Sequence, residues 1–216
     1  MGDVVLGIET SCDETAVAVV ERAAVVRSSV VSSQVEQHAR FGGVVPEIAG
    51  RAHVQELVPV LAEALATAGV EGPDVEVVAA TTGPGLVGSL LVGVSAAKAL
   101  SLVWGVPFVS VNHLEAHLYA SFLEEPDLEL PLVVLLVSGG HTMLVLMEDH
   151  GRYRLLGSTL DDAAGEAFDK VARYLGLGYP GGPAIDALAA EGDGSAFDYP
   201  RSMVQENPDT LPDDRR

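Results

Sequence analysis

Short apolar runs separated by glycine-rich or small-polar turns recur along the chain and predict strands. Three strands are expected near the N-terminus, at residues 4–10, 16–21 and 23–33. The same order returns further on, where strands are expected at 132–138, 143–148 and 152–159. Because the unit occurs twice, the pattern predicts a duplicated lobe in which a polar loop from each copy faces one cleft.

The second unit is built around the stretch LVVLLVSGGHT. Its first six residues show no polar alternation, which predicts a fully buried strand that ends in the turn Ser138, Gly139 and Gly140. Glycines lack a Cβ, so a ligand can approach the backbone, and successive N–H groups in such a turn can point at an anion such as phosphate. An ordinary hairpin turn is the alternative for this sequence taken alone. The repeat favours a nucleotide held between the two loops.

Helices are expected between and after these strands. Apolar spacing predicts an amphipathic helix at 53–68 and a buried helix at 86–104, whose Ser89, Gly93 and Ala97 form a flat face for close packing. Strands are expected at 75–82 and 107–111, and residues 34–51 are expected to form a polar loop beside the cleft. The pattern therefore places the chain in the α/β class.

The last third of the sequence predicts two more helices. One lies within residues 160–178, where Asp161 or Asp162 is expected to cap it. Asp169 lies beside its apolar stripe, either as a solvated edge residue or as an acceptor for ribose hydroxyls. A second glycine-rich turn, YPGGPAID, then opens the next helix and includes Gly182 and Asp186. Periodicity stops near residue 191, so an extended or disordered tail is expected.

Composition narrows the class of protein. Hydrophobic residues make up 48% of the chain, which is ample for a core, and the net charge of −19 predicts a strongly acidic surface. The negative electrostatic field of such a surface repels nucleic acid, so any RNA must be held by a local basic patch or by another subunit.

Cellular location follows from the same kind of reasoning. The single cysteine, Cys12, excludes an intrachain disulfide, fits a reducing cytosol and is expected to be buried and inert. No basic region precedes the first apolar residues, and the apolar stretch 86–109 contains Lys98, so neither a secretory signal nor a membrane span is expected. A cytoplasmic protein without membrane contact is predicted.

Two histidines suggest a metal site. His113 and His117 are spaced so that both imidazoles lie on one face of a helix and can reach one ion. Leu114 stands where a zinc protease of the His-Glu-x-x-His kind would need its glutamate, which argues against that class. Two ligands do not close a metal site, and the same spacing also arises in helices that bind no metal.

Taken together, the motifs resemble one known family. GIETSCDET, GGVVPEIAGRAH, TTGPGLVGSLLVG, the His113 and His117 pair, LLVSGGHT, DDAAGEAFDK and YPGGPAID occur in the order typical of bacterial tRNA N6-adenosine threonylcarbamoyltransferases, formerly called O-sialoglycoprotein endopeptidases. The resemblance implies an actin-like ATPase fold of two ribonuclease-H-like lobes. It divides the chain into an N-terminal actin-like lobe at 1–128, a partial second lobe at 129–198 and a tail at 199–216.

The resemblance also implies a reaction and a site. A threonylcarbamoyl group would pass from threonylcarbamoyl-AMP to N6 of adenosine 37 in tRNAs that read codons beginning with A. One divalent metal would be held by His113, His117 and an aspartate of the second lobe. Fe²⁺ is expected in preference to Zn²⁺. The implied partners are tRNA, a paralogous actin-like subunit and a small ATPase. The adenylate, or ATP, would be bound by residues of the central turn and of the two later helices: Leu136, Val137, Ser138, Gly139, Gly140, Asp169, Gly182 and Asp186.

The chain departs from the family in one respect. It lacks the family's Cys-Thr-Asp-Asn-Gly motif, which carries the third metal ligand, and the asparagine of a later Gly-Gly turn. The second lobe is thus expected to be incomplete, as in a fragment, a split gene or a degenerate paralogue. Two other functions remain open: a non-catalytic subunit that docks a partner, and an actin-like ATPase or sugar kinase in which Asp13 and Glu14 supply the acidic Mg²⁺ site and the catalytic base.

Overall fold

A computed structural model describes residues 4–22 and 24–199, and its first lobe is a five-stranded mixed sheet. The strand order is β3-β2-β1-β4-β5, in which β1 pairs antiparallel with β2 and parallel with β4. The expected strands are confirmed, with bounds at β1 Val4–Glu9, β2 Glu14–Glu21, β3 Val25–Ser33, β4 Val77–Gly83 and β5 Phe108–Asn112.

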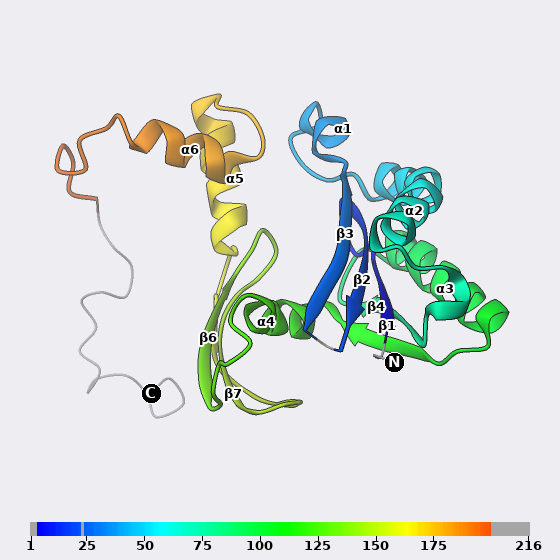
Figure 1. Ribbon diagram of the computed structural model, residues 1–216. Coiled ribbons are helices and arrows are strands. Elements are labelled where there is room, and N and C mark those ends of the chain that lie inside the picture. The colour runs from blue at the N-terminus through cyan, green and yellow to red at the C-terminus, as the bar shows by residue number, and fades with distance from the viewer. Residues whose placement is uncertain (1–3, 23, 200–216) are drawn as a thin grey trace.

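Two long helices cover one face of this sheet (Figure 1). They are α2, Pro46–Ala68, and α3, Val87–Trp104, and a short 3-10 helix at Gly72–Asp74 follows α2. Alternate residues of β1, namely Val4, Leu6 and Ile8, point into the core against these helices, as a half-covered strand requires. The core of the first lobe therefore lies between the sheet and α2 and α3.

The expected small-residue face of α3 is confirmed, but the prediction that this helix is buried is wrong. Ser89, Gly93 and Ala97 are buried, and Thr10 Oγ1 at the end of β1 donates to Ser89 O at 2.9 Å. The opposite face is exposed, with large apolar side chains at Val87, Leu91, Leu102 and Val103. By length and composition alone, α3 is also the one helix of the described residues that is long and apolar enough to cross a membrane.

The prediction of a loop at 34–51 is wrong at both ends. A short helix, α1, occupies Val35–Ala39, and α2 begins at Pro46, so Glu47 and Arg51 lie on a helix and form an i,i+4 ion pair. Proline at the first position of a helix is favourable, because it has no N–H to leave unpaired. Only residues 40–45 remain a connection.

The second lobe begins after α4, His113–Glu124, and contains a three-stranded sheet of order β6-β7-β8. Its strands are β6 Leu132–Val137, β7 Thr142–Asp149 and β8 Arg152–Ser158, all antiparallel as β1, β2 and β3 are. The expected fully buried strand is not found: along β6, Val133 and Leu135 are 60% and 64% exposed, whereas Leu136 is buried beside Leu118 of α4. One face of this sheet is open.

Two helices follow, α5 at Ala164–Leu175 and α6 at Gly181–Ala189. Neither Asp161 nor Asp162 caps α5 as expected; instead Thr142 Oγ1 of β7 accepts from the N–H of Ala164 at 2.8 Å. Asp162 accepts from Lys170 Nζ at 2.6 Å. The start of α5 is thus tied to the sheet by a strand residue.

The expected actin-like α/β fold with an incomplete second lobe is confirmed. The second sheet repeats the three antiparallel strands of the first sheet and has no counterpart of β4 and β5 among the described residues. The division at 1–128 and 129–198 stays a prediction. Residues 191–199 form no helix or strand, and the rest of the expected tail, 200–216, lies outside the described residues.

Candidate functional site

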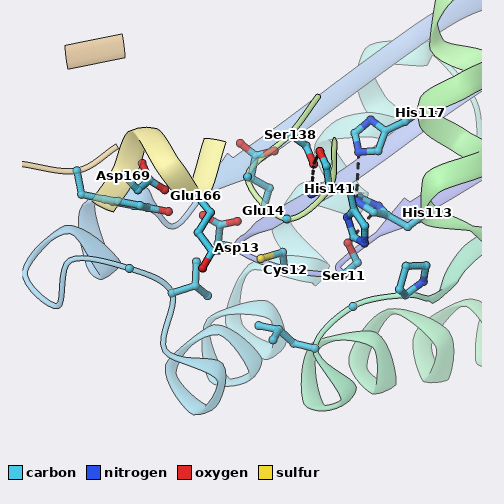
Figure 2. Close-up of a pocket in the computed structure, with 18 of the residues that line it drawn as sticks. Ser11, Cys12, Asp13, Glu14, His113, His117, Ser138, His141, Glu166 and Asp169 are labelled. Carbon is cyan, nitrogen blue, oxygen red and sulfur yellow. Dashed lines mark hydrogen bonds between the residues drawn. The ribbon is translucent and has the colours of Figure 1, made fainter. Parts of the chain in front are cut away.

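A cleft of about 810 Å³ lies between the two lobes. It is lined by the turn that ends β1, by the connection between α1 and α2, by the turn between β6 and β7, and by α5. Figure 2 shows His113 and His117 at one end and Glu166 and Asp169 at the other, with Asp13 and Glu14 between them. The polar loops of the two lobes therefore face one cleft, as the repeat predicts.

The histidine pair is positioned by the join between β5 and α4. Asn112 caps α4 by accepting from the N–H groups of Leu114 and Glu115 at 2.9 and 3.2 Å, which places His113 at the first helical position. The Nε2 atoms of His113 and His117 lie 3.2 Å apart, with the rings at an edge-on angle of 77°. The two Nε2 atoms are hydrogen-bonded to each other, so the i,i+4 spacing brings the imidazoles together on one helix face as expected.

Glu9, at the end of β1, accepts a hydrogen bond from the first histidine. Its Oε2 lies 3.2 Å from Nδ1 of His113, and an ionised carboxylate can only accept, so Nδ1 carries a proton. Burial opposes the charge on Glu9, but hydrogen bonds from His113, Ser11 and Thr81 outweigh it and lower the pKa of Glu9 to about 2. Glu9 is therefore ionised at neutral pH.

The donor set fits part of a metal site. Burial and then the neighbouring His113 lower the pKa of His117, which favours the neutral ring that a metal requires. Two imidazoles with neighbouring Nε2 atoms suit Fe²⁺ or Zn²⁺. Among residues 4–22 and 24–199, however, no third His, Cys, Asp or Glu completes a cluster. The described residues offer two candidate ligands, and the metal site stays a prediction.

The turn between β6 and β7 forms the opposite wall of the cleft. Ser138 N donates to His141 O at 2.8 Å, and His141 N donates to Ser138 Oγ at 3.0 Å, so the turn is closed on itself. A Cβ added at Gly139 or Gly140 would meet nothing within 4 Å, whereas one at Gly165 of α5 would lie 2.7 Å from Ser138 O. The turn is thus a hairpin that is supported from behind and open toward the cleft.

The other expected nucleotide-binding residues are spread over the second lobe. Asp169 lines the cleft, and its Oδ1 accepts from Gly181 N at 2.7 Å, which ties the second glycine-rich turn to α5. Leu136 is buried in the sheet and Val137 is exposed at its edge. Gly182 and Asp186 lie on α6 outside the cleft lining. The structure therefore brings Ser138, Gly139, Gly140 and Asp169 to one cleft but not the remaining four, whose roles stay predictions.

The loop after β1 supplies an acidic wall. Asp13 and Glu14 line the cleft, and Tyr179 lies opposite; burial first, then the charges of Asp13 and Asp169, raise the pKa of its phenol. Cys12 is exposed in this wall, not buried as expected. Burial of its sulfur and the charge of Asp13 nevertheless raise the pKa of the thiol to about 12, so it stays protonated at neutral pH.

A buried polar network holds both loops of the first lobe in place. His53 Nε2 donates to Cys12 O at 3.0 Å, and its Nδ1 accepts from Thr15 Oγ1 at 2.8 Å. Gln34 links this ring to that of His38, whose Nδ1 accepts from Val45 N at 3.3 Å. Burial lowers the pKa of His53, which keeps the ring neutral. The network fixes the loops that line the cleft through Cys12 and Val45.

Two residues of the site gave no usable signal in the sequence. Glu9 lies in a strand, where the alternation of apolar and polar residues predicts only which face of the sheet its side chain is on. Its contact with His113 joins residues 104 positions apart. Arg173 of α5 donates to the carbonyl oxygen of Gly42 across the cleft, a contact between segments 131 residues apart. The pairing of β1, β4 and β5 in the first sheet creates the first contact, and packing of the two lobes creates the second.

Comparison with known proteins gives a consistent result. Residues 25–211 match the family model for tRNA N6-adenosine threonylcarbamoyltransferase. Proteins of that name from Moorella thermoacetica and Anaeromyxobacter dehalogenans are 59% and 61% identical over 94% and 93% of this chain. The matches cover 59% and 60% of those proteins, so the chain spans about three fifths of the length of these curated relatives.

Solved structures give more distant likenesses. YeaZ from Pseudomonas aeruginosa is 20% identical, with a TM-score of 0.46 over 72% of this chain and 65% of that one. The ethanolamine utilization protein EutJ from Carboxydothermus hydrogenoformans is 18% identical, with a TM-score of 0.46 over 84% of this chain and 59% of that one.

Proposed function

The chain belongs to the tRNA N6-adenosine threonylcarbamoyltransferase family, and from this premise we propose that it forms the larger part of such an enzyme. In the proposed reaction, the threonylcarbamoyl group passes from threonylcarbamoyl-AMP to N6 of adenosine 37 in tRNAs that read codons beginning with A. One observation carries the proposal: a single cleft holds the converging Nε2 atoms of His113 and His117 and the open glycine turn 138–140.

The proposed chemistry assigns separate tasks to the two walls of the cleft. N6 of adenosine attacks the carbamoyl carbon, the bond from that carbon to the phosphate oxygen breaks, AMP leaves, and N6 loses a proton. The N–H groups of Gly139 and Gly140 supply donors for the charge on the phosphate or carbonyl oxygen. A divalent metal on His113 and His117 would add Lewis-acid chemistry, and Glu9 would orient the His113 ring by accepting from its Nδ1.

Under the proposal, the part of the relatives that this chain does not match completes the second lobe and the metal site. The open face of the second sheet exposes Val133, Leu135 and Val137, which suits a segment that completes the lobe. An aspartate from the same segment would be the third metal ligand, by the family resemblance. The donor would then be enclosed from both sides.

Partner subunits are part of the proposal. The outer face of α2 and α3 exposes Val54, Val58, Val87 and Leu91, an apolar surface of the kind that docks another protein. We assign to it the paralogous actin-like subunit, which works with a small ATPase. Because the net charge is −19, tRNA is held partly by these partners, in the cytoplasm.

Nucleotide binding to the cleft tests the proposal. A valine side chain at Gly139 would enter open space in the cleft, so Gly139→Val should remove binding of AMP and ATP with little effect on folding. Gly157→Val is the matched control, because Gly157 lies on β8, has nothing within 4 Å and is outside the cleft lining. Calorimetry would measure both. Equal affinity in the Gly139 variant and the unchanged chain would remove the cleft assignment.

A further inference from the structure

The turn after α1 displays an aromatic ring beside the cleft. Phe41 is 50% exposed, and the guanidinium carbon of Arg40 lies 4.7 Å from the centre of its ring. The next residues, Gly42, Gly43 and Val44, line the cleft itself. Figure 1 shows α1 at the end of the first sheet nearest to α5. An aromatic ring and a cation thus stand at the edge of the proposed active site.

The turn that carries this ring is rigid. Phe41 N donates to His38 O at 2.9 Å, and Gly42 N donates to Ala39 O at 3.0 Å. His38 itself is fully buried, and its ring accepts from Val45 N, so the turn is anchored on both sides of Phe41. Folding therefore fixes the backbone under Phe41 without using its ring. The half-exposed ring is therefore free to contact another molecule from a backbone that the fold holds in place.

Arg40 is one of the few basic residues that form no ion pair. The chain has 31 acidic and only 12 basic residues, and within 4–22 and 24–199 only Arg40, Lys98 and Arg173 are in no ion pair. Lys170 pairs with Asp162 and Glu166, whereas Arg173 bonds to the Gly42 carbonyl and so adds a second guanidinium beside the turn. At physiological salt the screening length is about 8 Å, so this pair of cations acts largely apart from distant carboxylates.

We propose that Arg40 and Phe41 form a stacking platform on which an unpaired base of the acceptor RNA loop rests while Arg40 contacts a phosphate. This inference rests on the proposed function, because the adenosine of that reaction lies in a single-stranded loop. Unpaired bases are recognised by stacking on aromatic rings and guanidinium planes. A purely apolar protein partner is disfavoured, since a cation already covers one face of the ring and the surrounding turn contains two glycines. The platform would hold the loop beside the cleft that binds the donor.

Fluorescence can detect stacking directly, because the chain has a single tryptophan, Trp104. Trp104 is replaced by phenylalanine, and Phe41→Trp then introduces the only reporter. Adding the unmodified anticodon stem-loop of a tRNA that reads a codon beginning with A should quench this reporter. A fully paired RNA hairpin stem of the same length should not. Phe197→Trp in the same background is the matched control, since Phe197 is also exposed but lies far along the sequence and outside the cleft lining.

Affinity for the same stem-loop, measured by fluorescence anisotropy, gives the second readout. Phe41→Leu should weaken binding by about 5- to 150-fold, because it keeps apolar bulk but removes the ring. Phe41→Trp should restore binding, and Arg40→Gln should weaken it more than Arg154→Gln, an exposed arginine on β8. These differences should persist in Gly139→Val, in which the donor pocket is filled.

Three results would overturn the platform: no quenching in the Phe41→Trp variant, unchanged affinity in Phe41→Leu, or loss of partner-subunit association in Phe41→Leu with RNA affinity retained. The last would assign the ring to a protein partner. A failure of the proposed function looks different, because AMP and ATP would then fail to bind the cleft while the RNA still quenched the reporter.

Discussion

At the residue scale, Glu9 orients the first of the two histidines that we propose as metal ligands. It accepts from Nδ1 of His113, whose Nε2 atom lies 3.2 Å from Nε2 of His117. With only two ligands, we expect weak binding of Fe²⁺ or Zn²⁺, which His117→Ala abolishes. Loss of a partner that orients a ligand typically costs 10–100-fold in metal affinity, so Glu9→Gln should weaken binding by about that factor.

Calorimetry with each metal measures this prediction. Glu115→Gln is the control, because Glu115 lies on the same helix but accepts from Tyr153 Oη at 2.6 Å and not from either histidine. It should bind metal as the unchanged chain does. Unaltered affinity in His117→Ala would refute the pair as ligands.

Cys12 gives a pH-dependent prediction at the same scale. The raised pKa of about 12 keeps the thiol protonated, and the thiolate is the reactive form, so alkylation by iodoacetamide at pH 8 should be at least about tenfold slower than for free cysteine. The rate should keep rising as pH increases toward 12. Asp13→Asn removes a charge that raises this pKa and should speed the reaction at pH 8. A rate that levels off below pH 9 would contradict the protonated thiol.

The sequence predicted the histidines and the glycine turn at this scale because both are local patterns. His113 and His117 are one helical turn apart, and Ser138 to Gly140 are consecutive. Glu9 and Arg173 could not be predicted, since the first meets His113 only when β1, β4 and β5 form one sheet and the second meets Gly42 only when the lobes pack. Cys12 was predicted to be buried and is exposed, because the prediction used only the usual burial of a lone cysteine and the sequence does not show the cleft beside it.

At the scale of elements, α3 is fixed by how closely its small residues approach β1. A Cβ added at Gly93 would collide with the side chain of Thr10, which itself bonds to the backbone of α3 at Ser89. Gly93→Ala should therefore lower the free energy of unfolding by about 1–3 kcal/mol, despite the better helix propensity of alanine.

Gly88→Ala is the matched variant on the same helix, since nothing lies within 4 Å of its added Cβ. It should leave stability within about 0.5 kcal/mol of the parent or raise it. Urea denaturation compares the two variants. Equal stabilities would show that α3 does not approach β1 as closely as the structure has it.

Strand positions were predicted well, whereas the exposed face of β6 and the start of α2 were not. Strands β1 to β8 lie within a few residues of their expected places, because apolar runs and glycine turns mark them locally. The run 132–137 gave no sign that Val133 and Leu135 face solvent, because burial depends on what covers the sheet. The start of α2 was placed too late, because the favourable position of Pro46 was read as a loop signal.

At the scale of the whole molecule, the described residues form a lobe with a five-stranded sheet and part of a second lobe with three strands. The proposed transfer requires donor, metal and adenosine to be held in one geometry, and a misplacement of about 1 Å can cost on the order of a hundredfold in rate. The described residues provide only two of the proposed metal ligands. The 216 residues alone are therefore expected to be inactive.

The most direct measurement is formation of threonylcarbamoyladenosine in an unmodified tRNA, given threonine, bicarbonate, ATP, the donor-making enzyme and the partner subunits. The account predicts no product from the chain as it stands. Product should appear when the missing segment of a full-length relative is joined in cis near Asp198. Product from the unextended chain would contradict the claim that its metal site and cleft are incomplete, and none from the extended chain would contradict the proposed function itself.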